Sequence, residues 1–137
     1  MVERFSATLE AGLLERFERF LKRRGYGNRS EAVRDLIRRA LVEDEWQADK
    51  GPVMGVITLV YDHHHRNLLN HLTRIQHDYQ TAIVSATHVH MDHHNCLEII
   101  IVKDRPSRIR SLADRLTTLK GVKSGQLTAA TTGRALT

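Results

Sequence analysis

Residues 82–103 read AIVSATHVHMDHHNCLEIIIVK, and this stretch decides the fold of the second half of the chain. Two runs rich in apolar residues, at about 82–91 and 96–103, flank the polar segment 92–95 (Asp-His-His-Asn). Strand-like runs joined by a short polar turn are typical of a β-hairpin. We therefore expect two antiparallel strands here.

The segments around this hairpin carry alternating strand and helix patterns. A β-rich run at 53–61 and a helical pattern at about 64–79 precede the hairpin, and a helix pattern at 106–120 and a strand pattern at about 122–130 follow it. The resulting order, β-α-β-β-α-β, is that of a ferredoxin-like split. The second half, residues 53–137, is thus predicted to be one α+β domain.

The first half carries one strand pattern and two helix patterns. Apolar and polar side chains alternate in residues 3–9, as in a half-buried strand. Helical spacing covers 10–24 and, after a Gly-Tyr-Gly break, about 28–46. Asn28 stands three residues before Glu31, which is the spacing of a helix N-cap. This half is therefore a β-α-α unit.

We assign residues 1–47 to the first domain and 48–52, which contain Gly-Pro, to a linker. A lone strand leaves its backbone groups without partners. The same strand of a second chain would supply them, and the two would form an antiparallel ribbon. Such a ribbon fits the major groove of double-stranded DNA.

The charge of the chain agrees with a nucleic-acid partner, since its formal net charge is +5. Side chains on the outer face of the ribbon would contact base edges, and those at the start of the second helix would hold a phosphate. The DNA-binding residues that we expect are Arg4, Ser6, Thr8, Asn28, Arg29 and Ser30.

The hairpin also carries metal-binding side chains. His88 and His90 point to one face because side chains alternate along a strand. If residue 90 pairs with residue 96, Cys96 lies beside His90, and Glu98 lies beside His88, where it would fix the histidine tautomer. His77, near the end of a helix, is a candidate fourth ligand. Thiolate with imidazoles suits zinc, copper or nickel, and the residue types do not decide among them.

Nine histidines fall in one window of 32 residues. Six of them occupy expected turns and helix ends, and we interpret these as solvated: His63, His64, His65, His71, His93 and His94.

Two stretches resemble known families. Residues 4–9 (RFSATL) with 25–34 (GYGNRSEAVR) resemble the ribbon-helix-helix repressors. Gln76-His77 with residues 87–98 (THVHMDHHNCLE) resembles the nickel-responsive ribbon-helix-helix regulators, and that likeness covers nearly the whole chain.

The resemblance implies an ACT-like second domain that forms a homotetramer, and a cytoplasmic repressor of nickel uptake whose nickel(II) raises its affinity for operator DNA. It implies square-planar nickel held by His88, His90 and Cys96 of one subunit with His77 of a neighbour. It places base contacts at Arg4, Ser6 and Thr8, where Ser6 departs from a common threonine. It also implies a second cation site, which would fall on Glu31 and Asp35.

Several other functions are less favoured. An amino-acid sensor would need no role for Cys96, a metal store would need no operator, and an antitoxin would have a disordered tail. An enzyme is least favoured, because no nucleophile–base pair is evident and four protein ligands leave a metal no open position. The single cysteine fits a reducing cytoplasm. The sequence contains no run of about 18 apolar residues, so it predicts no membrane-spanning helix.

Overall fold

The computed structural model describes residues 1–136 and divides into two units, Met1–Ala40 and Leu41–Thr137. Within the described residues, no helix is long and apolar enough to cross a membrane.

The first unit contains one complete helix and the greater part of a second. Helix α1 (Ala11–Arg24) ends at Gly25, whose positive φ of 75° suits a residue without a side chain. Helix α2 (Arg29–Ala48) then begins, and Asn28 Oδ1 accepts the Glu31 backbone N–H at 2.9 Å. This hydrogen bond confirms the N-cap expected at Asn28.

The strand expected at residues 3–9 does not form in the single chain. Residues 1–9 have no regular secondary structure, and the apolar side chains of Phe5 and Leu9 are exposed. A lone strand has nothing to pair with here, so the two-stranded ribbon stays a prediction about two chains.

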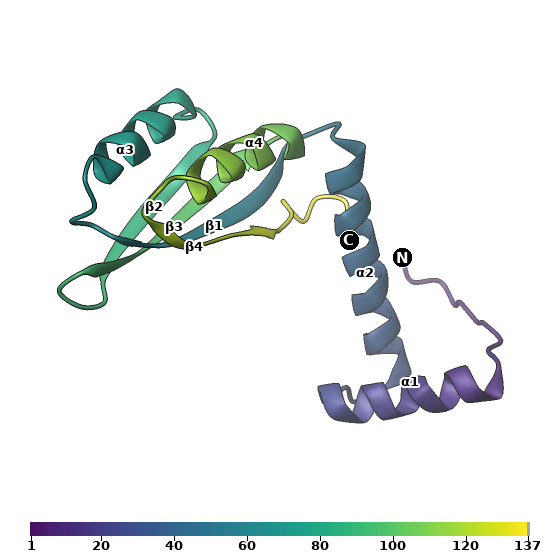
Figure 1. Cartoon of the computed structure of the whole chain (residues 1–137). Coiled ribbons are helices and arrows are strands. Elements are labelled where there is room, and N and C mark those ends of the chain that lie inside the picture. Colours follow the sequence, from purple (N-terminus) through teal and green to yellow (C-terminus); the bar gives the residue numbers. More distant parts are fainter. Residues whose placement is uncertain (137) are drawn as a thin grey trace. The chain divides into compact units, whose positions relative to one another are not determined.

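The second unit has the β-α-β-β-α-β order expected from the sequence (Figure 1). Its four strands form one antiparallel sheet with the order β2-β3-β1-β4. The elements are β1 (Val53–Asp62), α3 (Leu68–Asp78), β2 (Ile83–His90), β3 (Asn95–Asp104), α4 (Pro106–Thr117) and β4 (Val122–Ala129). Helix α3 starts four residues later than expected, because residues 63–67 form a turn.

The core lies between one face of the sheet and the two helices α3 and α4 (Figure 1). Burial alternates along β1 and β3, as it does when only one face of a sheet is covered. The core includes Ile57, Ile100 and Leu112, all fully buried. The opposite face stays partly exposed although β1 and β3 place apolar side chains there: Val56, Val60, Leu97, Ile99 and Ile101.

The last turns of α2 and the segment that follows it belong to the second unit. Trp46 is buried in its core, and its indole N–H donates to the Ala130 carbonyl at 2.8 Å. Asp49 accepts the Ser107 backbone N–H at 2.8 Å, a contact that lowers the pKa of Asp49 and caps the first turn of α4.

Replacing Leu112 by Ala tests the core. Leu112 is fully buried on α4, so the substitution leaves a cavity and should lower the free energy of unfolding by about 2–5 kcal/mol. Leu69→Ala on α3 is the matched control, because Leu69 is 44% exposed and should cost far less. Urea denaturation measures both, and equal losses would contradict this description of the core.

Candidate metal centre

The β2–β3 hairpin has the register on which the metal site depends. His88 pairs with Glu98 and His90 with Cys96 across the antiparallel ladder. The Cys96 Sγ and the His90 Nδ1 are 3.3 Å apart. The register assumed from the sequence is therefore the observed one, and it brings an imidazole and a thiol together.

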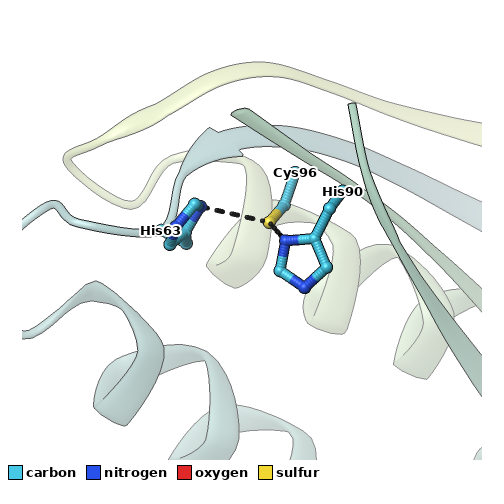
Figure 2. A group of neighbouring side chains, drawn as sticks. All are labelled: His63, His90 and Cys96. Carbon is cyan, nitrogen blue, oxygen red and sulfur yellow. Dashed lines mark hydrogen bonds between the residues drawn. The ribbon is translucent and has the colours of Figure 1, made fainter. Parts of the chain in front are cut away.

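A third donor group comes from the end of β1. The Nδ1 atom of His63 lies 3.4 Å from Cys96 Sγ and approaches it from a different direction than His90 (Figure 2). Within residues 1–136, three potential metal ligands lie together: the donor atoms of His63, His90 and Cys96 are all within 4.8 Å of one another. We call these three residues the intrachain triad.

His63 was expected to be solvated, but it is partly buried and contacts the Cys96 thiol. Strand β1 pairs with β3 so that Tyr61 lies opposite Cys96, which brings the next residues of the chain to the thiol. The His63 backbone N–H also donates to the His94 carbonyl at 3.1 Å. This contact depends on strand pairing between distant segments, and no local sequence signal marks it.

The remaining histidines differ in exposure. His77, in the last turn of α3, is exposed and lies outside the intrachain triad. His65 is half-buried, and its Nδ1 is buried without a hydrogen-bond partner. The histidines found exposed, as expected, are His64, His71, His93 and His94.

A buried carboxylate organises the groups around His88. Glu98 is fully buried, and its Oε2 accepts the Tyr61 hydroxyl at 2.9 Å. Its Oε1 accepts the Gln76 amide at 2.8 Å and lies 3.3 Å from His88 Nε2. The Tyr61 hydroxyl oxygen is 3.2 Å from His88 Nδ1, so both ring nitrogens of His88 are in contact with this network.

Burial and negative charge govern two titrating groups of the site. Burial, and then the neighbouring carboxylates with Glu98 first, raise the pKa of the Cys96 thiol. Burial, and then Glu98, also raise the pKa of Tyr61 above its ordinary value. A metal that binds Cys96 must therefore displace the thiol proton.

The turn that positions Cys96 is held by Asp92. Its Oδ1 accepts the backbone N–H groups of His94 and Asn95, each at 2.8 Å. The side chain of Asn95 donates to both carboxylate oxygens as well. These hydrogen bonds lower the pKa of Asp92 to about 2 and fix the turn directly before Cys96.

The residues expected to contact DNA lie on the first unit. Arg4, Ser6 and Thr8 are exposed in the segment before α1. Around the start of α2, Asn28, Arg29 and Ser30 are exposed, although the Arg29 guanidinium is paired with Glu18.

The second cation site expected at Glu31 and Asp35 has mixed surroundings. A surface hollow is lined by both residues, and also by Arg34 and Arg38. Asp35 accepts the Tyr26 hydroxyl at 3.0 Å and lies 3.6 Å from the Arg38 guanidinium. A cation at this place stays a prediction.

Comparison with known proteins agrees with a metal-binding role. Residues 54–130 match the family model of the NikR C-terminal nickel-binding domain. A protein of Desulfovibrio desulfuricans named as a nickel-responsive regulator is 50% identical over 133 residues, 97% of this chain and 96% of its own length. A protein of Desulfotalea psychrophila with the same name is 52% identical over 136 residues, 99% of each chain.

Among solved structures, an uncharacterised protein of Thermotoga maritima aligns with a TM-score of 0.52 at 13% identity, over 57% of this chain and 96% of that one. That likeness shows the fold alone. Imidazole and thiol groups gathered on a ferredoxin-like sheet define a metal-binding domain of the nickel-binding class. The chain belongs to the family of nickel-responsive regulators.

Replacing Tyr61 by Phe tests the buried network. The change removes the hydroxyl that donates to Glu98 and leaves a buried carboxylate oxygen without that partner, so the free energy of unfolding should fall by about 1–3 kcal/mol. Tyr79→Phe is the matched control, because the Tyr79 hydroxyl bonds Ser111 at the surface and should change stability by about 0.5 kcal/mol or less. Thermal or urea unfolding measures both, and an unchanged Tyr61→Phe protein would show that the network does not stabilise the fold.

Proposed function

We propose that this chain is a nickel-responsive, DNA-binding repressor of nickel uptake genes, acting in the cytoplasm as a regulator and not as an enzyme. The observation that carries the proposal is the pairing of His90 with Cys96 and of His88 with Glu98 on the β2–β3 hairpin. This pairing sets two imidazoles and a thiol along one edge of the sheet, and the family match names nickel as the metal.

The donor set fits nickel(II), which binds imidazole and thiolate ligands. His88, His90 and Cys96 of one chain, with His77 of a neighbouring chain, would hold the ion. Bound there, nickel would supply a cross-link between two chains. The exposure of His77 on α3 supports this, because an exposed imidazole is free to reach another subunit.

The buried network joins the helix that carries His77 to the strand that carries Cys96. Gln76, next to His77 on α3, donates to Glu98 of β3, and Glu98 contacts His88 of β2. His88 has to release one of its contacts, to Tyr61 or to Glu98, before a ring nitrogen can bind a metal. A change in the contacts of His88 would therefore reach the end of α3 through Glu98 and Gln76. Supporting contacts of this kind orient a metal-binding histidine.

The open face of the sheet gives the chain a surface for self-association. Apolar residues of β1 and β3 stay partly exposed there, among them Val56, Leu97 and Ile101. A contiguous exposed apolar patch on a soluble domain is typical of a protein interface. We take its partner to be a second copy, and with the ribbon pairing of residues 3–9 this gives a homotetramer of two ribbon dimers.

The DNA-binding half would act through the exposed segment before α1. Paired with a second chain, it presents Arg4, Ser6 and Thr8 on one face, and such a ribbon reads the major groove. The start of α2, with Asn28, Arg29 and Ser30, would bind the DNA backbone. Metal and operator would then raise each other's affinity, because coupling between two sites is reciprocal.

Arg4→Ala tests the DNA half. Loss of an arginine that contacts a base should reduce the preference for the operator over a mismatched duplex by about 1–3 kcal/mol. The operator is first selected from random duplexes with the nickel-loaded protein, and binding is then measured at one salt concentration. Arg74→Ala, an exposed arginine on α3, is the control and should keep the preference. Equal preferences for Arg4→Ala and the native chain would remove this strand from the DNA interface.

Cys96→Ala tests the metal half. Without the thiolate, nickel affinity should fall at least about 100-fold, since loss of a mere supporting contact already costs 10- to 100-fold. Competition with a chelator measures the affinity, and circular dichroism checks the fold. His71→Ala, an exposed histidine on α3, should bind nickel like the native chain. Native nickel affinity in Cys96→Ala would refute the site.

A further inference from the structure

The intrachain triad is assembled without any second subunit. Its three donor groups come from the residue directly after β1, the end of β2 and the start of β3, and these are neighbouring strands of one sheet. Figure 2 shows the His63 and His90 rings converging on the Cys96 sulfur from different sides. The two rings are nearly perpendicular, at 87°, with centroids 5.5 Å apart.

The placement of His63 is part of the fold. Its backbone N–H is bonded to the His94 carbonyl in the β2–β3 turn, and that turn is fixed by Asp92. The preceding residues, Tyr61 and Asp62, still pair with β3. His63 therefore meets Cys96 through strand pairing, and its approach does not depend on a free loop.

The sulfur–nitrogen separations within the triad lie in the range that the ligands of one metal ion span. With metal–sulfur and metal–nitrogen bonds of about 2.3 and 2.0 Å, ligand atoms lie about 3.5 Å apart at a tetrahedral angle and about 3.0 Å apart at a right angle. The sulfur–nitrogen separations are 3.3 Å to His90 and 3.4 Å to His63. Zinc is the common divalent ion that takes imidazole and thiolate ligands in a tetrahedron.

His88 stands apart from the triad. Both of its ring nitrogens lie against Tyr61 and Glu98, so in this state it has no nitrogen directed at the thiol. The proposed nickel ligands therefore require His88 to release one of these two contacts, whereas the triad requires no such change. His90 and Cys96 belong to both ligand sets.

We infer that His63, His90 and Cys96 of one chain form a second metal site, which takes a tetrahedral ion of the zinc class and leaves its fourth position open. The inference rests on the proposed function only in that His90 and Cys96 are shared with the nickel site. Because they are shared, zinc and nickel exclude each other on one chain. Zinc held by the triad uses neither His88 nor the His77 of a neighbour, so it does not tie two subunits together.

The test uses the full chain with zinc alone, and with cobalt(II) alone as a coloured substitute for zinc. His63→Ala should weaken zinc binding at least about tenfold in chelator competition and reduce the intense visible absorption of tetrahedral cobalt. His64→Ala is the matched control: it removes the adjacent exposed imidazole and should leave both readouts unchanged. His88→Ala should also leave zinc and cobalt binding unchanged while lowering nickel affinity.

His63→Gln, with circular dichroism, repeats the measurement in case His63→Ala fails to fold, and the same weakening is expected. Native zinc affinity and cobalt absorption in the His63 variants would overturn the inference. Equal weakening by His63→Ala and His88→Ala would overturn it too, because His88 would then contribute to zinc binding and the three residues would not be the site. Failure of nickel to tighten DNA binding, with zinc still dependent on His63, would instead reject the proposed function and keep the triad.

Discussion

The pairing of His90 with Cys96 across the β2–β3 ladder is the constraint on which the rest of the site depends. Side chains alternate along a strand, so a slip of one residue would turn Cys96 away from the histidines and expose Glu98. Two features oppose such a slip. Ile100 and Val102 of β3 must face the core, and Asp92 holds the turn through hydrogen bonds to His94 and Asn95.

The same register buries the carboxylate of Glu98. A fully buried carboxylate is costly unless its oxygens are paired, and it is tolerated here because Tyr61 and Gln76 donate to it. The same contacts connect β1 and α3 to the strand that carries Cys96. His88, which we propose as a nickel ligand, thus contacts a network of groups from three other elements. Through Gln76 this network reaches the helix that carries His77.

Much of this arrangement follows from local sequence patterns. Runs rich in apolar residues predict β1 and β3, and the short polar turn predicts the hairpin. The pairing of residue 90 with residue 96 is an assumption when only the sequence is known, and the structure bears it out. His63 is different, because its approach to Cys96 arises from the pairing of β1 with β3, which joins segments more than 30 residues apart. Residues 3–9 are the reverse case, in which a local pattern is present but the structure does not form. Their alternation predicts a strand, yet a single chain supplies no partner strand for it.

The most direct test of the account is DNA binding by the metal-free protein, titrated with nickel, zinc and copper at one fixed salt concentration, with absorption spectra recorded on the same samples. Nickel should tighten binding to the selected operator, and a thiolate-to-nickel charge-transfer band should grow in parallel if Cys96 is the ligand that we propose. Equal tightening by zinc, or none by any metal, would contradict the account.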